Sequence, residues 1–405
     1  MPSNKDLRKN IIYSYFWSGI QKFGVLFLQF VSNIILARLL SPEDFGYIAI
    51  IAVILNIMQA IVEGGFGSAI VQRRNINETD ISTIFISNFA IATILFLLLI
   101  ISSSLIETYY NLYNLKVYVR AEGFILIINA LCIVQMNMLI REMRFRSFFI
   151  SNFVSVLISV FLAIFCAVRG MGVWSFVIRD LSKELILLIL LFHFSPWRPQ
   201  RLSISKIAFI DIFQYSFPIL MASLARRIYD SAQALVIGRQ SSPVKLGYYI
   251  QAKKMEEVPI TGFADSISQV LFPALSREYE CGMLSGNSFF RKNVKMMNFM
   301  IIPIVAIAEL CADSIFHILF GTQWNNSIPM FKIICLAGIT IPAVKASSEA
   351  LKAAGRSDLF FYVQLIQRLL GFIFILLSSF LGLTAVLWAL VINSIIFFIS
   401  NMYFR

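Results

Sequence analysis

Charged side chains are scarce in this sequence. They account for 14% of the residues, whereas a soluble globular domain carries about 25%. Hydrophobic residues account for 59% of the chain, and the mean hydropathy is +0.79. This composition excludes a water-soluble fold.

The sequence has only two histidines, and none of its five cysteines lies close to another cysteine. His193 and His317 lie far apart, and the five cysteines stand singly without a Cys-x-x-Cys motif. Zinc sites and thiol redox sites need such residues in closely spaced groups. We therefore expect no metal site, no cofactor and no catalytic residues.

Long uncharged runs are abundant, for example from Ile81 to Ile106. A helix of about 20 apolar residues crosses the roughly 30 Å of hydrocarbon in a bilayer. The runs predict an all-α polytopic membrane protein with about twelve transmembrane helices. We place them near residues 12–36, 45–64, 82–105, 121–140, 147–168, 173–196, 213–237, 247–273, 296–318, 328–347, 359–379 and 384–404.

The net charge of +12 comes from basic residues that gather in alternate short loops, such as Arg141, Arg144 and Arg146. Cytoplasmic loops carry an excess of lysine and arginine. The pattern predicts a multi-pass membrane protein with both termini in the cytoplasm, and it argues against nucleic acid as a partner. The loops are too short for a soluble catalytic domain.

The sequence contains an internal repeat. The pattern Arg-x-x-Ser-Pro-x-x-apolar-Gly-Tyr occurs at 38–47 and again at 239–248, and Gly65-Phe66 and Trp174 return in the same order as Gly262-Phe263 and Trp388. A single Ser-Pro pair merely favours a helix start, but three landmarks in order favour duplication. We expect two six-helix lobes, 1–206 and 207–405, related by a pseudo-two-fold axis along the membrane normal.

The motifs also carry a family resemblance. Asn-Ile-Ile-Leu-Ala-Arg-Leu-Leu-Ser-Pro-Glu-Asp-Phe-Gly at 33–46 is followed by Gly-Gly-Phe-Gly-Ser-Ala-Ile-Val-Gln at 64–72, and Phe-Pro-Ala-Leu-Ser (272–276) and Leu-Lys-Ala-Ala-Gly-Arg (351–356) occur later. The chain resembles the polysaccharide exporters and Wzx-type flippases of the multidrug/oligosaccharidyl-lipid/polysaccharide (MOP) superfamily, over nearly its whole length.

This resemblance implies a MATE-like fold. It also implies a flippase that moves a polyprenyl-pyrophosphate-linked oligosaccharide, such as an O-antigen, capsule or exopolysaccharide repeat unit, across the inner membrane by alternating access without hydrolysis. The implied partners are the lipid bilayer, the lipid-linked oligosaccharide, a proton or sodium counter-ion, and other glycan-assembly proteins.

Ionisable side chains inside spans cost about 2.5–3.5 kcal/mol each to insert, so they usually face a water-filled pathway. Polar stripes follow the first two helices of each half, which the resemblance places along the cleft between the lobes. The cavity-lining candidates are Gln29, Asn33, Asn56, Gln59 and Gln233.

Basic residues on the same helices are candidates for binding the pyrophosphate, because guanidinium groups pair phosphate oxygens bidentately and lysines add charge. They are Lys22, Arg226, Arg227, Lys253 and Lys254. An alternative remains open, in which Arg226 pairs with Asp230 and Lys253 with Glu257 only to lower the cost of insertion.

Carboxylates on these helices are candidate proton or sodium sites, since a desolvated carboxylate can change its charge between states. They are Glu63, Asp230, Glu257 and Asp265. The span near 173–196 also carries Arg179, Asp180, Lys183 and Glu184, for which a self-neutralised helix face is favoured over substrate contact.

Two other functions remain open. A cation-coupled multidrug antiporter of the MATE type would share the two-lobe architecture but favours an acidic, aromatic cavity, so binding of lipid pyrophosphate rather than organic cations discriminates against it. A membrane glycan polymerase would need a larger outer loop, and would turn over a polyprenyl-linked sugar without moving it between leaflets.

Overall fold

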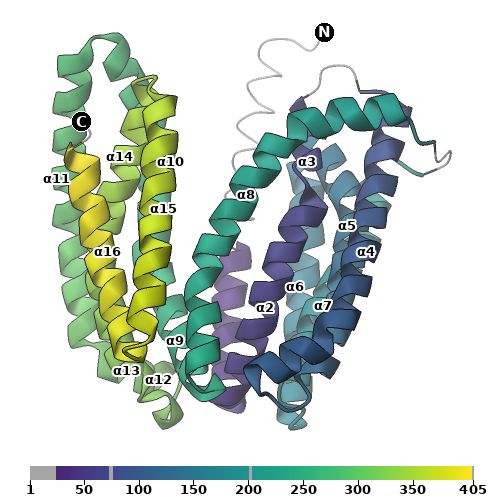
Figure 1. Cartoon of the computed structure of the whole chain (residues 1–405), viewed down its shortest axis with the longest axis horizontal. Coiled ribbons are helices and arrows are strands. Elements are labelled where there is room, and N and C mark those ends of the chain that lie inside the picture. The colour runs from purple at the N-terminus through teal and green to yellow at the C-terminus, as the bar shows by residue number, and fades with distance from the viewer. Residues whose placement is uncertain (1–23, 73–75, 200–202, 404–405) are drawn as a thin grey trace. The chain divides into compact units, whose positions relative to one another are not determined.

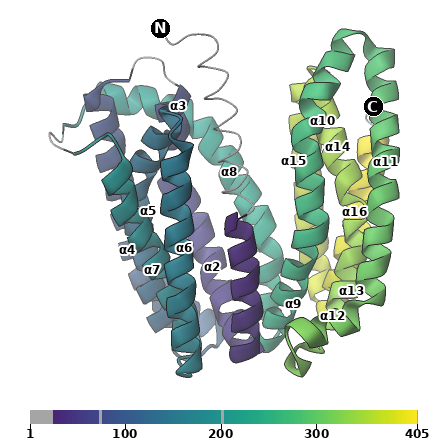
Figure 2. The same ribbon diagram turned by 180° about the vertical axis from the view of Figure 1, so that it is seen from behind.

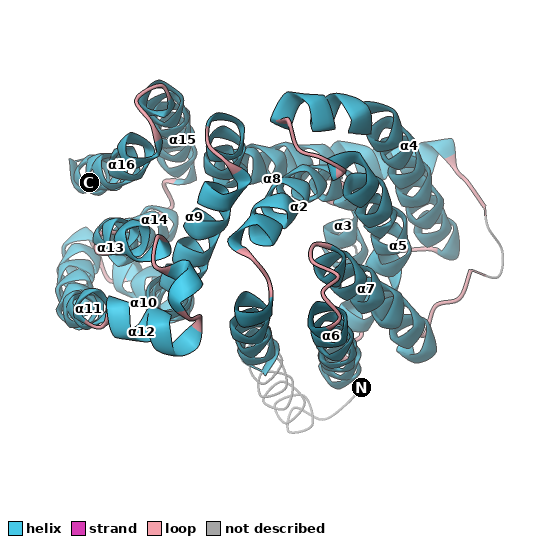
Figure 3. Ribbon diagram, turned by 90° about the horizontal axis from the view of Figure 1, so that it is seen from below, coloured by secondary structure: helices cyan, strands magenta, loops and turns pink. Residues whose placement is uncertain are grey.

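The fold is entirely helical. The computed structural model describes the chain except residues 1–23, 73–75, 200–202 and 404–405, and these described residues contain helices and loops but no strand (Figure 3). The all-α polytopic fold class predicted from the sequence is confirmed.

The chain forms two compact units, Met1–Ser231 and Ala232–Arg405. In the first unit a helix over Gly24–Leu39 precedes seven further helices (Figure 1). They are α2 (Pro42–Glu63), α3 (Phe66–Gln72), α4 (Glu78–Tyr110), α5 (Leu115–Arg141), α6 (Phe145–Val168), α7 (Trp174–Phe194) and α8 (Lys206–Gln240).

The second unit begins within the last turns of α8. It continues with α9 (Pro243–Glu256), the π-helix η1 (Glu257–Thr261), α10 (Gly262–Glu280), α11 (Met283–Leu310), α12 (Ala312–Leu319), the 3₁₀ turn η2 (Thr322–Trp324), α13 (Ser327–Gly338), α14 (Ile341–Ala353), α15 (Ser357–Ser379) and α16 (Leu383–Tyr403). The division into lobes 1–206 and 207–405 and the symmetry axis stay predictions.

Each predicted span overlaps a helix or a pair of helices. In the described part of the chain, nine helices are long and apolar enough to cross a membrane, and Gly24–Leu39 is a shorter apolar helix. The span expected near 247–273 consists of α9, η1 and α10, and the span near 328–347 consists of α13 and α14. Each interruption falls inside one predicted span, so the length of the span alone does not reveal it.

The repeated Ser-Pro landmark starts a helix in both units. Ser41 caps α2 by accepting a hydrogen bond from the backbone N–H of Asp44, and Pro42 opens the helix. Ser242 caps α9 in the same way, and Pro243 follows it. A hydroxyl cap satisfies one of the free N–H groups of the first turn, and proline has no N–H to satisfy there. The landmark therefore has the same local structure in each unit.

In each unit, the helix that begins at the Ser-Pro pair is interrupted before the Gly-Phe pair of the repeat, which is Gly65-Phe66 or Gly262-Phe263. In the first unit, α2 ends at Gly64, whose backbone is left-handed with φ 54°, and α3 begins at Phe66. In the second unit the interruption is η1, which contains Pro259 in the sequence. Proline removes one backbone donor, and short π-helical turns are often found at functional sites.

The outer surface of the first unit is apolar. Along α4, large exposed side chains include Ile94, Leu97, Ile101 and Leu105. A soluble protein rarely exposes contiguous apolar surface of this extent, whereas lipid-facing helices require it. The chain is therefore a multi-pass membrane protein.

Candidate functional site

Arg227 joins α8 to α2 in the first unit. Its guanidinium donates to the Glu63 carboxylate (Nη2 to Oε2, 2.7 Å) and to the backbone carbonyl of Asn56 (3.0 Å). The Arg227 side chain is 28% exposed, and that of Glu63 is 45% exposed. The side chain of Arg227, a predicted basic residue, therefore contacts α2 at two predicted positions, Asn56 and Glu63.

Arg226, the neighbour of Arg227, lies in a more open environment. Its Nε is 3.8 Å from Oδ2 of Asp230, and the two side chains are 70% and 60% exposed. An exposed pair at this separation contributes little energy. The Arg226–Asp230 pair that was an open alternative in the sequence analysis is present. Because the two groups are 3.8 Å apart and exposed, Asp230 covers little of the Arg226 guanidinium.

These exposed charges belong to helices that cross the membrane. The first unit does not bury Arg226 and Asp230 in its own core. Charged side chains in spans face water-filled space or other protein rather than lipid. This side of α8 is therefore expected to line an aqueous region.

In the second unit, Gln233 of α8 bridges two residues of α9. Its carbonyl oxygen accepts hydrogen bonds from the hydroxyl of Tyr249 and from Nζ of Lys253, the latter at 3.3 Å. Tyr249 is 1% exposed. Gln233 and Lys253 were both predicted site residues, whereas the contribution of Tyr249 was not foreseen.

We expect Gln233→Met to destabilise the second unit. The methionine would leave the buried Tyr249 hydroxyl without its acceptor, and a buried donor left unsatisfied costs about 1–3 kcal/mol. The double variant Gln233→Met/Tyr249→Phe should recover about 1–2 kcal/mol, because replacing both partners removes this penalty. Lys253 loses the same contact in both variants, so the difference in unfolding midpoint reports the hydroxyl. Equal midpoints would contradict the prediction.

The carboxylates around η1 differ in their environment. Glu257, predicted as an ion-coupling candidate, is exposed, whereas its neighbour Glu256 is 4% exposed and accepts a hydrogen bond from the hydroxyl of Thr261 at 3.3 Å. Helix α13 approaches closely, since a Cβ on Gly338 would lie 3.4 Å from Oε1 of Glu256. Burial was the missing signal, because both glutamates occupy the same predicted span.

The remaining predicted residues are not brought into these contacts. Gln29 is exposed and Asn33 is half-buried on the first helix, Gln59 is half-buried on α2, and Lys254 is half-buried on α9. Lys22 lies outside the described residues, as does the side chain of Asp265. Their roles stay predictions.

A group of charged side chains, only partly buried, lies where α5 packs on α7. Arg179, Asp180, Lys183 and Glu184 of α7 were named from the sequence, whereas Glu122 of α5 was missed. The side chains of Arg179, Asp180 and Lys183 are 25%, 27% and 30% exposed. Glu122 is 3% exposed. It lies at the start of the span predicted near 121–140, and sequence spacing does not show that α5 packs on α7.

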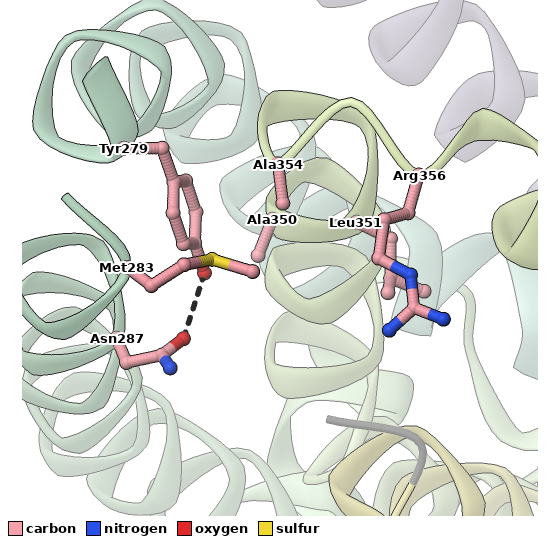
Figure 4. Close-up of a pocket in the computed structure, with 7 residues that line it drawn as sticks. All are labelled: Tyr279, Met283, Asn287, Ala350, Leu351, Ala354 and Arg356. Atoms are coloured by element: carbon pink, nitrogen blue, oxygen red, sulfur yellow. Dashed lines mark hydrogen bonds between the residues drawn. The ribbon is translucent and has the colours of Figure 1, made fainter.

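The second unit also has a small surface pocket (Figure 4). The hydroxyl of Tyr279 donates to the side-chain oxygen of Asn287 at 3.0 Å across its floor. The lining residues come from the α10 to α11 connection and from the end of α14: Tyr279, Met283, Asn287, Ala350, Leu351, Ala354 and Arg356. None of the predicted site residues lines it.

The described residues hold no group of three or more histidine, cysteine, aspartate or glutamate side chains placed to bind a metal ion.

Comparisons with known proteins place these features in a family. The family model described as "Polysaccharide biosynthesis protein" matches residues 35–329. The succinoglycan biosynthesis transport protein ExoT of Rhizobium meliloti is 23% identical over 366 residues, which cover 89% of this chain and 72% of ExoT. The resemblance noted from the motifs is confirmed.

Solved structures share the fold. The lipid II flippase MurJ in an inward closed conformation superposes with a TM-score of 0.78 at 15% identity, covering 96% of this chain and 87% of MurJ. An inward-facing MATE multidrug transporter of the MOP superfamily superposes with a TM-score of 0.70 at 13% identity, covering 93% and 94% of the two chains. The fold is MATE-like.

Proposed function

Because the chain belongs to the polysaccharide biosynthesis protein family, we propose that it is a flippase for polyprenyl-pyrophosphate-linked oligosaccharides. The family match is the observation that carries the proposal. ExoT, a relative over most of the chain, is named as a transport protein for a polysaccharide. The fold shared with a lipid II flippase supports the same class of cargo.

The charged residues of the spanning helices support an anionic headgroup as ligand. Arg226 and Arg227 of α8 and Lys253 and Lys254 of α9 supply the charge that a pyrophosphate requires. Each basic side chain raises the free energy of inserting its helix, so four of them would be unfavourable in helices whose sole role is to cross the bilayer. We include Lys22 in the same binding group.

The proposal extends to location and mechanism. The protein resides in a bacterial inner membrane with both termini in the cytoplasm, it alternates access between the two leaflets, and it moves its substrate without catalysing a reaction. A cation gradient drives export, and other glycan-assembly proteins act before and after it.

Reconstitution tests this function directly. Liposomes containing the purified protein and a fluorescently labelled polyprenyl-pyrophosphate-linked oligosaccharide are exposed to a quencher that cannot cross membranes. We expect label from the inner leaflet to become quenched at a rate that depends on the protein, whereas protein-free liposomes keep it protected. Protection of the label in both preparations would exclude the flippase.

The multidrug antiporter is tested with the same liposomes, because the fold is common to both classes. Accumulation of a fluorescent organic cation in the absence of any movement of the labelled lipid would favour the antiporter. Release of sugar from the lipid carrier without movement between leaflets would favour an enzyme.

A further inference from the structure

The surface pocket of the second unit is lined by none of the predicted site residues, so the proposed function leaves it unexplained. It forms where the connection between α10 and α11, at the top of the second unit in Figure 2, meets the end of α14, which packs on both helices. Its empty volume is about 330 Å³, including the space open to solvent. Ligand pockets range from about 300 to 1,000 Å³, so this pocket has room for one small group.

The way in which α14 ends places Arg356 at the pocket. The backbone N–H groups of Gly355 and Arg356 donate to the carbonyls of Lys352 and Leu351, both at 3.1 Å. These two hydrogen bonds make a Schellman motif, which needs a left-handed residue, and Gly355 supplies it with φ 73°. The chain therefore reverses after α14, and Figure 4 shows the Arg356 side chain extending back along the end of that helix. The Leu-Lys-Ala-Ala-Gly-Arg motif thus directs its arginine to the pocket.

The guanidinium of Arg356 is available to a ligand. Arg356 is exposed and lines the pocket, and no described side chain forms an ion pair or a hydrogen bond with it. Two carboxylates of the lining helices are engaged elsewhere, since Glu349 pairs with Lys352 at 2.8 Å and Glu278 accepts a hydrogen bond from Ser285. A guanidinium without a carboxylate partner can bind a phosphate through two parallel hydrogen bonds.

The floor of the pocket offers a second group of donors. The Tyr279 hydroxyl donates to Oδ1 of Asn287 at 3.0 Å, and among the described residues none accepts a hydrogen bond from Nδ2 of Asn287. Gly286 allows this arrangement, because a Cβ there would overlap the Tyr279 ring. The described lining residues include no aspartate or glutamate. A pocket that presents amide and guanidinium N–H groups without a carboxylate is suited to an anion.

The surroundings of the pocket favour a lipid over a free anion. Met283 and Leu284 at the start of α11 are 59% and 88% exposed, and Met283 also lines the pocket. Helix α11 and the segment Ser327–Ala353 are both long and apolar enough to cross a membrane, so their ends lie at the level of the lipid headgroups. Exposed apolar side chains beside a basic pocket at that level suit a molecule that has both a phosphate and acyl chains.

We propose that this pocket binds the phosphate headgroup of an anionic phospholipid from the surrounding bilayer. Arg356 pairs with the phosphate oxygens, the Asn287 amide donates to a headgroup oxygen, and the acyl chains lie against Met283 and Leu284. The charge pattern of the loops predicts that this end of the second unit faces the cytoplasm, and the cytoplasmic leaflet carries anionic lipids. The inference does not depend on the flippase function.

Native mass spectrometry of the purified full chain tests the site without any transport. Protein released from micelles that contain phosphatidylglycerol should retain one lipid tightly. Phosphatidylcholine with the same acyl chains should bind more weakly, because its choline cation would lie beside Arg356. We expect Arg356→Gln to reduce the affinity for phosphatidylglycerol by about tenfold or more, since hydrogen bonds to charged groups are strong. Arg356→Lys keeps the charge without the planar fork, so its affinity should fall between the two.

Two further variants separate binding from folding. Asn287→Leu removes the amide donors and nearly keeps the size of the side chain, and it should weaken phosphatidylglycerol binding by about two- to tenfold. The matched control is Arg144→Gln, which makes the same change of charge in the first unit, where Arg144 is 51% exposed and pairs with Glu142 at 2.8 Å. It should bind the lipid as the wild type does. Because Arg356 is exposed, Arg356→Gln should unfold at the same temperature as the wild type.

Three results would overturn the proposal. The first is equal retention of phosphatidylglycerol by the wild type, Arg356→Gln and Asn287→Leu. The second is displacement of the lipid by inorganic phosphate at the same concentration, which would identify a site for free phosphate. The third is displacement by the lipid-linked oligosaccharide in preference to phosphatidylglycerol, which would assign the pocket to the transported substrate.

Discussion

Replacing Arg226, Arg227, Lys253 and Lys254 together with glutamine should reduce movement of the lipid-linked oligosaccharide by about 100-fold or more. Hydrogen bonds to charged groups contribute about 1.5–3 kcal/mol each, so loss of two effective contacts to a pyrophosphate is sufficient for this decrease. The variant should still insert, because an uncharged amide is less costly in a span than a lysine or arginine. The measurement is the initial rate of label movement per reconstituted protein.

The chain offers a control of equal composition. Arg277, Arg291, Lys292 and Lys295 are also two arginines and two lysines, and all four are exposed, Arg277 on α10 and the other three on the first half of α11. Their replacement by glutamine should leave the rate within about twofold of the wild type, since exposed charges remote from a ligand contribute little. A wild-type rate in the first quadruple variant would reject the assignment of the pyrophosphate-binding residues.

A comparison of single and double variants separates binding from charge neutralisation. If Arg227 serves only to neutralise Glu63, to which it donates at 2.7 Å, then Arg227→Gln leaves an unpaired carboxylate and Arg227→Gln/Glu63→Gln restores transport. If Arg227 binds substrate, the double variant remains inactive. We expect the double variant to remain inactive. Arg227 and Glu63 are in contact, so their effects must be measured as a pair and cannot be assumed to add.

The sequence was sufficient to predict which residues share a helix and which face of it they occupy. Run length located each span, and the Ser-Pro pairs at 41–42 and 242–243 located two helix starts. Asn56 and Glu63 were predicted on one face of α2, because residues seven apart in a helix lie above one another, and Arg227 contacts the Glu63 carboxylate and the backbone carbonyl of Asn56.

The sequence was not sufficient to predict which helices meet. Periodicity describes one helix at a time, so it gave no reason to join Glu122 to Asp180, which are far apart in the chain and belong to different helices. Similarly, Glu256 and Glu257 are adjacent in one predicted span, and the packing of other helices against α9 and η1, α13 among them, leaves the first buried and the second exposed. Tertiary packing decides which ionisable groups lose contact with water, and that loss distinguishes a functional candidate.

We expect a second large effect, a loss of stability, from Gly65→Ala, and its cause is also tertiary packing. Gly65 lies between α2 and α3 with a left-handed backbone, φ 72°. A Cβ there would lie 2.8 Å from the backbone oxygen of Ser216 and 3.2 Å from Cβ of Ile219, both on α8. Backbone atoms of a helix cannot move aside as a flexible side chain can, so the clash must displace α8.

The substitution combines two penalties. A left-handed conformation costs an L-residue about 1–2 kcal/mol, and overpacking of a well-packed site costs about 1–3 kcal/mol. We therefore expect Gly65→Ala to reduce the free energy of unfolding by about 2–5 kcal/mol and to lower the yield of monodisperse protein in detergent.

Gly170→Ala separates the two penalties. Gly170 has nearly the same backbone conformation, φ 73°, but a Cβ built there has no heavy atom within 4 Å. It should therefore show only the conformational cost of about 1–2 kcal/mol. The difference between the unfolding midpoints of the two variants measures the contact of Gly65 with α8. If Gly65→Ala were as stable as Gly170→Ala, the close approach of α8 to Gly65 would contribute nothing to the stability of the first unit, and α8 would be free to move without disturbing α2 and α3.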